Sequence, residues 1–343
     1  MQSIAMEDFM ATMQDVAKKA RVSVTTVSRV LNGDPRVNAA TRARVEHWIT
    51  TMGYQPNLMA RSLRRQTSRV VGLVVDTLKN PFTAELSQGL AAHLDAAGYQ
   101  LILADTQRQA SRGPDMVQML AQRGVDGILY AAGWEDGPET LAVACGLLAK
   151  SGVPTVMVGN YLRTVPSVFV DHRQGTRDAV AYLHQLGHQY LVFVSGAQDT
   201  ETSRLRQQGF LQAAAEWPQV SATIYPSRGS LAGAAAIVHD ILTHAPQTTA
   251  IVAASDYLAA GILSGLFDHA CRVPQDMSVI GFDNVQMSQF LCPALTTMDA
   301  DIPQLATLAC EHLALLLQEP AQPPPPSPLI PRLVVRHSVG PPR

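Results

Sequence analysis

The spacing of apolar residues divides the chain into two regions. As far as about residue 52, apolar residues recur every three or four positions, which places them on one face of a helix. The first such face is formed by Val16, Ala17 and Ala20, and the second by Val27, Val30 and Leu31. From residue 69 onward, short apolar runs alternate with segments of helical periodicity. This pattern predicts a small all-α domain followed by a larger α/β domain.

Residues 13–32 read as two short helices joined by a tight turn, with Val22 pointing inward at the turn. Ser23 stands where its hydroxyl can accept from the first N–H groups of the second helix. The outer face of that helix carries Val24, Thr25, Ser28, Arg29 and Asn32. Short hydroxyls, an amide and one arginine suit a helix that lies in the DNA major groove. A solvated helix pair at the edge of a larger domain has a similar composition, so this stretch alone leaves both interpretations open.

A third helix is predicted from about Ala39 to Met52. Val45, Trp48, Ile49 and Met52 recur with helical spacing and would close a small core over the first two helices. Gly53 follows directly and is a residue typical of helix C-termini. Thr41, Arg42 and Arg44 fall on the outer side, where they could reach phosphates.

The larger region shows the rhythm of two parallel sheets covered by helices. Four strand candidates, residues 70–75, 99–104, 127–132 and 154–159, are followed by 190–195, 221–226, 249–254 and 277–282. Helical segments separate them, as in βαβ units. We therefore expect two doubly wound lobes, with the chain crossing between them near residues 168–171, 297–299 and 324–330. Ligands of such sheets bind at the carboxyl ends of the strands.

Charge is distributed unevenly between the two regions. The 343 residues carry a formal net charge of −2, and 47% of them are hydrophobic, which fits several cores rather than one. Residues 1–70 hold 11 Lys/Arg and five Asp/Glu, a balance of +6, so the rest of the chain carries −8. A basic head on an acidic body is expected when only the head contacts nucleic acid.

The cysteines and the first residues indicate the compartment. Cys145, Cys271, Cys292 and Cys310 form no C-x-x-C pair and have apolar neighbours, which favours free thiols in a reducing compartment. Residues 1–10 lack the basic start and apolar run of a secretory signal, and no stretch approaches the ~20 apolar residues of a membrane span. We expect residues 1–11 to be disordered. We also expect a cytoplasmic protein, without membrane contact, that associates with the nucleoid when it is bound to DNA.

A series of motifs resembles the lactose-repressor/galactose-repressor family. It comprises DVAKKARVSVTTVSRVLNG at residues 15–33, V-N-x-x-T-R at 37–42, GYQPN at 53–57, ARSL at 60–63 and LVVRHS at 333–338. The resemblance implies a helix-turn-helix domain at 12–56, a hinge helix at 57–68 and a two-lobed, periplasmic-binding-protein-like effector domain at 69–343. The lobes would comprise about 69–168 plus 299–325 and about 169–298 plus 326–338. Arg21 stands where such headpieces often have glycine; if the position needs a positive φ, arginine costs roughly 1 kcal/mol there.

The resemblance also implies which residues contact DNA. They are Ser23, Val24, Thr25, Ser28, Arg29, Asn32, Arg36, Asn38, Thr41, Tyr54, Asn57, Ala60 and Leu63. Leu63 matches the leucine that enters the minor groove and opens a base step. Ala60 is small where two hinge helices of a dimer would approach each other. Because an isolated helix this short is unstable in water, the alternative is a simple tether.

Residues of the larger region that match effector contacts follow strand candidates. They are Asp76 and Phe82 after the first strand, Arg206 in S-R-L-R-x-x-G-F, Ser255 and Asp256 after residues 249–254, and Asp283 in G-F-D-N. The resemblance implies that Arg206 grips the effector and that Asp283 fixes a sugar or a base. Ser255 stands where the family usually has asparagine, and Asp256 has a helix-capping or positioning role as its alternative. Carboxylate and guanidinium groups beside an aromatic ring suit polyhydroxylated ligands.

Enzyme and transport classes fit the sequence less well. His184 and His188 have zinc-ligand spacing, but Gln185 stands where H-E-x-x-H has glutamate. Neither a dinucleotide-binding glycine motif nor a G-x-S-x-G nucleophile motif is present, so we expect no metal, no cofactor and no enzymatic activity. A periplasmic solute-binding protein would share the two lobes but would need a signal peptide and no basic head.

The sequence therefore predicts a repressor that binds a pseudo-palindromic operator in double-stranded DNA and responds to a small effector, a sugar or sugar derivative. We expect a homodimer, because residues 333–343 contain no heptad for a coiled coil that would build a tetramer.

Overall fold

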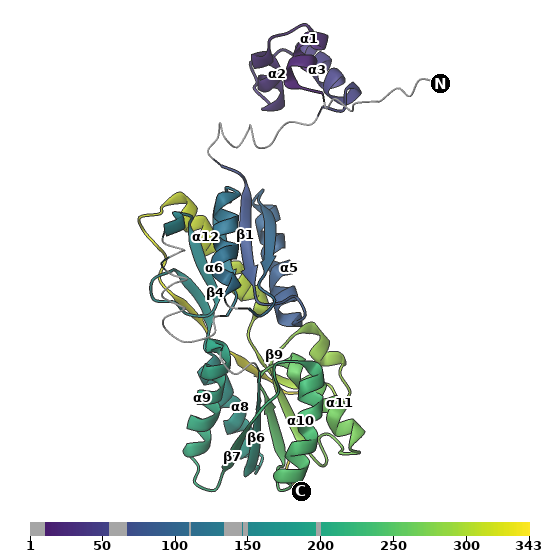
Figure 1. Ribbon diagram of the computed structural model, residues 1–343, viewed down its shortest axis with the longest axis vertical. Coiled ribbons are helices and arrows are strands. Elements are labelled where there is room, and N and C mark those ends of the chain that lie inside the picture. Colours follow the sequence, from purple (N-terminus) through teal and green to yellow (C-terminus); the bar gives the residue numbers. More distant parts are fainter. Residues whose placement is uncertain (1–10, 55–66, 110, 134–145, 147–149, 197–199) are drawn as a thin grey trace, which may run out of the picture. The chain divides into compact units, whose positions relative to one another are not determined.

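The computed structural model describes residues 11–54, 67–109, 111–133, 146, 150–196 and 200–343 (Figure 1). Internal contacts divide the chain into two compact units, Met1–Ser68 and Arg69–Arg343. The predicted hinge residues 57–66 lie outside the described residues, and so do residues 1–10 of the predicted disordered start.

The described residues of the first unit form three helices, α1 (Met13–Ala20), α2 (Val24–Leu31) and α3 (Ala39–Thr51). Val16, Ala20, Val27 and Val45 are buried between them. Trp48, Ile49 and Met52 pack against this core, which confirms the predicted helical stripe. The first unit therefore has its own hydrophobic core.

The helix ends of the first unit follow local sequence signals. Ser23 Oγ accepts from Thr26 N at 3.1 Å, as predicted, and Asn38 Oδ1 accepts from Thr41 N at 2.8 Å. Arg21 ends α1 with φ 50°, so it does occupy the left-handed region that usually favours glycine. Gly53, just beyond α3, has φ +59° and likewise matches its predicted role.

The parts of the second unit that the structure describes form two six-stranded sheets. The first comprises β1 (Val70–Val75), β2 (Gln100–Asp105), β3 (Gly127–Ala131), β4 (Thr155–Gly159), β5 (Ser167–Val170) and β11 (Ser327–Leu329), in the order β11-β5-β4-β3-β1-β2. The second comprises β6 (Tyr190–Ser195), β7 (Ser221–Pro226), β8 (Ala250–Ala253), β9 (Ser278–Asp283), β10 (Thr296–Asp299) and β12 (Arg332–Val334), in the order β12-β10-β9-β8-β6-β7. Neighbouring strands are parallel except for β10 and β12.

Helices cover both sheets. They are α5 (Pro81–Ala96), α6 (Arg112–Gln122), α8 (His172–Gln185), α9 (Glu201–Ala215), α10 (Leu231–His244), α11 (Asp256–Asp268) and α12 (Ile302–Gln318), with a 3-10 helix η1 at Gln286–Phe290. Helix α5 packs on α12 over the first sheet, and in the second lobe α8 packs on α9 and α10 on α11 (Figure 1). Side chains of β1 alternate between two cores, with Leu73 facing α5 and Val74 facing the α6 side. This alternation explains why the strands read as continuous apolar runs.

All eight predicted strands are confirmed, with bounds that differ by one residue at most at either end. The four unpredicted strands, β5, β10, β11 and β12, are short and lie at the crossings between the lobes.

The predicted lobe boundary at 325/326 is wrong, because β11 pairs with β5 of the first sheet and the chain enters the second sheet only at Arg332. The first sheet ends at Val170, within the predicted crossing at 168–171 but two residues beyond the predicted lobe boundary, and Asp299 still belongs to the second sheet. Within the described part of the chain, no helix has the length and apolar character needed to cross a membrane.

Candidate DNA-reading helix and effector pocket

The outer face of α2 presents the residues predicted to read DNA. Val24 has 41% of its surface exposed, and Thr25 and Arg29 lie on the same side of the helix. Asn32 donates from Nδ2 to the carbonyl of Ser28 at 2.8 Å, so its side chain lies along the end of the helix. The opposite face, with Val27 and Val30, is buried. The helix is therefore fixed by its core face and leaves a polar face for a partner.

Other predicted DNA contacts have structural tasks as well. Asn38 caps α3, and Arg36 forms a fork with Asp34. Tyr54 is only 7% exposed and packs into the small core, and its contact with DNA stays a prediction. Asn57, Ala60 and Leu63 lie outside the described residues.

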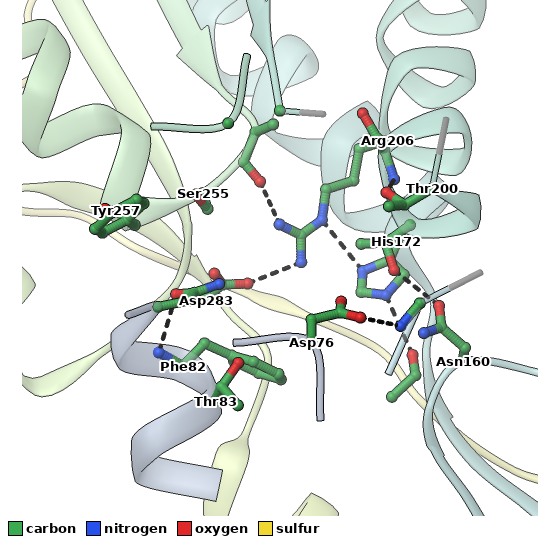
Figure 2. Close-up of a pocket in the computed structure, with 18 of the residues that line it drawn as sticks. Asp76, Phe82, Thr83, Asn160, His172, Thr200, Arg206, Ser255, Tyr257 and Asp283 are labelled. Atoms are coloured by element: carbon green, nitrogen blue, oxygen red, sulfur yellow. Dashed lines mark hydrogen bonds and ion pairs between the residues drawn. The ribbon is translucent and has the colours of Figure 1, made fainter. Parts of the chain in front are cut away.

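A cavity of about 180 Å³ lies between the two sheets of the second unit (Figure 2). Its lining residues follow the carboxyl ends of strands from both lobes. Asp76 follows β1 and Asn160 follows β4, whereas Ala254 follows β8 and Asp283 ends β9. This is the position at which doubly wound sheets bind ligands.

Arg206 lies at the centre of this pocket, although it is only 5% exposed. Its Nη2 donates to Asp283 Oδ1 at 2.8 Å, its Nη1 donates to the carbonyl of Ala254, and its Nε donates to His172 Nδ1 at 3.3 Å. The guanidinium also stacks on the Phe282 ring at 3.7 Å. Because each of its nitrogens has a partner within the protein, the arginine is held in place before a ligand arrives.

Asp283 is the buried counter-charge of Arg206. Burial raises the pKa of its carboxyl, and the neighbouring guanidinium opposes that rise. Its backbone φ is 114°, a conformation that residues other than glycine rarely adopt and that often marks functional sites. The pair therefore brings a fixed donor and a fixed acceptor to the same wall of the pocket.

His172 connects the arginine to the other lobe. Since Nδ1 accepts from Arg206, the ring proton belongs on Nε2, which donates to the carbonyl of Gly159 at 3.2 Å. Burial, and then the charge of Arg206, hold the pKa of His172 well below its ordinary value. The imidazole is consequently neutral at physiological pH and links the end of β4 to Arg206.

Known proteins share both parts of this arrangement. Residues 12–57 match the bacterial regulatory proteins of the lacI family, and residues 180–339 match a periplasmic binding protein-like domain. Catabolite control protein A of Priestia megaterium is 32% identical over 309 residues, which cover 88% of this chain and 91% of that protein. The chain belongs to the lacI family of bacterial regulatory proteins. It is thus a DNA-binding transcription regulator, and its relatives are regulators rather than enzymes.

Solved structures of lacI-family regulators have the same fold. The lac repressor dimer bound to operator and an anti-inducer superimposes with a TM-score of 0.86 at 26% identity, over 97% of this chain and all of that one. A lacI-family regulator from Enterococcus faecium with bound ribose gives a TM-score of 0.70 at 26% identity, over 80% of this chain and all of that one.

Five of the six predicted effector residues of this lacI-family regulator line the pocket, namely Asp76, Phe82, Arg206, Ser255 and Asp283. Asp256 does not. Its carboxylate accepts from Val285 N at 2.9 Å and from the hydroxyl of Thr297 in the interior, beside Gly281, where a Cβ would collide with it. Burial raises the pKa of Asp256 well above its ordinary value. Asp256 therefore joins the segment after β9 to β10, which is the positioning role that the sequence left as its alternative, and its side chain does not line the cavity.

Several pocket residues escaped the sequence analysis. Asn160, His172, Thr200, Thr202, Ser203 and Tyr257 line the cavity. Thr202 donates to Asn160 Oδ1 at 2.8 Å, and the buried Ser203 Oγ has no hydrogen-bond partner among the described residues. Asn160 directly follows a predicted strand, so the carboxyl-end rule could have found it. The remaining residues belong to helix starts that the sequence alone does not bring together.

The two histidines with zinc-ligand spacing serve other contacts. His188 uses both ring nitrogens, one with Thr249 Oγ1 and one with the carbonyl of Gly340, each at 2.8 Å. His184 stacks on Trp217 with ring centroids 4.3 Å apart. Within the described ranges, no group of three or more potential metal ligands is found.

Proposed function

We propose that this regulator binds an uncharged, polyhydroxylated effector, a sugar or sugar derivative, in the pocket around Arg206, and that the effector alters its affinity for operator DNA. The observation that carries the proposal is the buried Arg206–Asp283 pair inside a cavity lined by hydroxyl and amide groups. Because Arg206 is already neutralised by the aspartate, this pair favours contacts with hydroxyl groups over contacts with a phosphate.

Each lobe supplies part of the site. Asp76 accepts from Gly133 N at 2.6 Å and points toward the cavity from the first lobe, as does Phe82 (Figure 2). From the second lobe come Arg206, Asp283 and Tyr257. An aromatic face packs against the C–H groups of a sugar ring while charged groups take its hydroxyls. The ribose in the Enterococcus faecium relative supports the same ligand class here.

The DNA side of the proposal rests on α2. In a homodimer, two copies of α2 would enter successive major grooves of a pseudo-palindrome, with Val24, Thr25 and Arg29 toward the bases and Ser23, Ser28, Asn32, Arg36, Asn38 and Thr41 around them. Residues 57–68 would form hinge helices on the operator. A change in the angle between the lobes would alter the spacing of the two hinges. Effector and operator affinities are then coupled equally in both directions.

We further propose that the regulator acts in the cytoplasm, where it is bound to the nucleoid through its operators, and that it has no enzymatic activity. The effector is identified by thermal shift of the full chain with pentoses, hexoses, disaccharides, sugar acids, sugar phosphates and nucleobases. We expect a neutral sugar to raise the melting temperature and to change the gel shift of a duplex that the protein has selected from a random library. Stabilisation by nucleobases or sugar phosphates alone would contradict the proposed ligand class.

A further inference from the structure

Three arginines of the first unit converge on one aspartate. Asp34 lies in the loop between α2 and α3, next to the C-terminal end of the DNA-reading helix. Its carboxylate is paired with Arg36 and Arg29, and its backbone carbonyl accepts from Arg42 Nη2 at 2.8 Å. The aspartate side chain is 14% exposed, whereas those of Arg29 and Arg36 are 51% and 75% exposed. A negative charge therefore lies among groups that are placed to meet a polyanion.

The two carboxylate pairs differ in geometry. Arg36 binds as a fork, with Nε 3.0 Å from Oδ1 and Nη2 2.8 Å from Oδ2, and its backbone N–H also donates to Oδ1 at 3.0 Å. Arg29 is held more loosely, through Nε at 3.9 Å from Oδ2. Its two terminal amino groups have no other partner among the residues that the structure describes. They form the end of the guanidinium that can bind O6 and N7 of a guanine together.

The charge of Asp34 is permanent under physiological conditions. Hydrogen bonds from the Arg36 side chain and backbone hold the pKa of the Asp34 carboxyl at about 2. The same pair raises the pKa of Arg36. A DNA phosphate near this loop must therefore compete with the Asp34 carboxylate for Arg29 and Arg36.

We propose that Asp34 determines the DNA specificity of this regulator, by holding Arg29 through Nε for end-on contact with a guanine and by withholding Arg36 from the phosphates of unrelated DNA. The inference rests on the proposed reading of a base by Arg29. On random DNA, an arginine that leaves Asp34 loses its pairing with the carboxylate and gains only a contact with a phosphate. On the operator, Arg29 stays beside Asp34 and gains two base hydrogen bonds, so the same carboxylate penalises the wrong site more than the right one.

Asp34→Asn tests this proposal in the full chain. Asparagine keeps an oxygen that can accept from the Arg36 backbone, so the loop is preserved, which helix content by circular dichroism verifies. Glu46→Gln is the matched control, because Glu46 is exposed on α3 of the same unit and makes no side-chain hydrogen bond among the described residues. Both substitutions remove one negative charge. Affinities are measured for the duplex selected from a random library and for a shuffled duplex of the same length, across a series of salt concentrations.

We expect Asp34→Asn to raise affinity for the shuffled duplex severalfold and to lower the ratio of selected to shuffled affinity by about tenfold, whereas Glu46→Gln leaves the ratio unchanged. The salt dependence on the shuffled duplex should steepen by about 0.9 in log–log slope for each Arg36 released. In an Arg36→Ala background, the gain on shuffled DNA should vanish; in an Arg29→Ala background, Asp34→Asn should no longer weaken selected-duplex binding relative to Glu46→Gln.

Two failures can be told apart. If Asp34→Asn behaves like Glu46→Gln on both duplexes, the role of Asp34 is refuted while base reading by Arg29 stands. If Arg29→Ala alone loses equally on both duplexes, Arg29 contacts only phosphate, and the proposed base contact is refuted first.

Discussion

Arg206 has three hydrogen-bond partners and an aromatic ring against it, all supplied by the protein itself. Such a residue is preorganised, so binding energy is not spent on ordering it. Removing it leaves Asp283 buried without its counter-charge. Breaking one side of a buried pair typically costs about 3–5 kcal/mol. Arg206 therefore stabilises the second lobe, and we expect it to bind the ligand as well.

We predict that Arg206→Ala abolishes the effector response and lowers the melting temperature, while operator affinity at low temperature stays within a few-fold of wild type. The measurement is a gel shift with and without the sugar identified by thermal shift. Arg204→Ala is the control, because Arg204 lies on the same helix and pairs with Glu201 at the surface. A normal response of Arg206→Ala at the wild-type effector concentration would show that the ligand lies elsewhere.

At the scale of elements, hydrogen bonds hold the lobes together at separate points around the pocket. Glu85 of α5 accepts from Gln286 N of η1 at 2.8 Å, and Arg108, beyond β2, donates to the carbonyl of Gly229, beyond β7. Both bonds join one lobe to the other. They therefore stabilise this arrangement against others reached by hinge motion.

Glu85→Ala and Arg108→Ala should consequently shift the lobe equilibrium in the same direction. We expect each to change effector-free operator affinity by a few-fold, with the same sign for both variants; effector affinity is left out of the comparison because Arg108 also lines the pocket. Asp95→Ala, on the exposed side of α5, is the control. Opposite signs for the two variants would mean that these contacts do not report on one shared motion.

The hinge element, residues 57–68, stays a prediction from the family resemblance. A leucine wedge must recover the cost of unstacking a base step from the burial of its side chain. Leu63→Ala removes about 2 kcal/mol of that burial, so two copies should lower specific operator affinity by roughly two to four kcal/mol. Non-specific binding should hardly change, because no basic residue is lost. Operator affinity and DNA bending equal to wild type would leave the segment as a tether.

At the scale of the whole molecule, buried histidines make stability depend on pH. His172, His188 and His312 all have pKa values lowered by burial. The ordinary pKa of histidine is 6.5, so below pH 6.5 these histidines become protonated in the unfolded chain while they stay neutral in the folded protein. Their contribution to stability is therefore lost as pH falls below about 6.5.

His172→Asn should flatten this dependence, since asparagine does not titrate. For a single site, the slope removed is at most about 1.4 kcal/mol per pH unit. The raised pKa values of Asp256 and Asp283 have the opposite effect on the pH dependence of stability. The melting temperature of the variant is therefore compared with that of wild type at each pH from about 7 to about 5. If the melting temperatures of the two proteins change with pH in parallel across that range, His172 does not contribute to the pH dependence of stability.

Much of the architecture was predictable from local patterns. The stripe from Val45 to Met52, the cap at Ser23 and the positive φ at Arg21 each depend on a few neighbouring residues. The eight longer strands are continuous apolar runs, because both faces of their sheets are covered. The short strands at the crossings contain too few residues for such a pattern.

The sequence by itself determined the helices of the first unit, the eight longer strands, the basic character of residues 1–70, and that residues at strand ends would meet. Those properties follow from periodicity and charge, which act over short stretches of chain. Only the tertiary structure decided where side chains at those ends point. Ser255 and Asp256 are adjacent, yet the first lines the pocket while the second joins the segment after β9 to β10. His172 and Asp283 acquire their roles from Arg206, which is distant in sequence, because electrostatic contacts depend on distance in space and not along the chain.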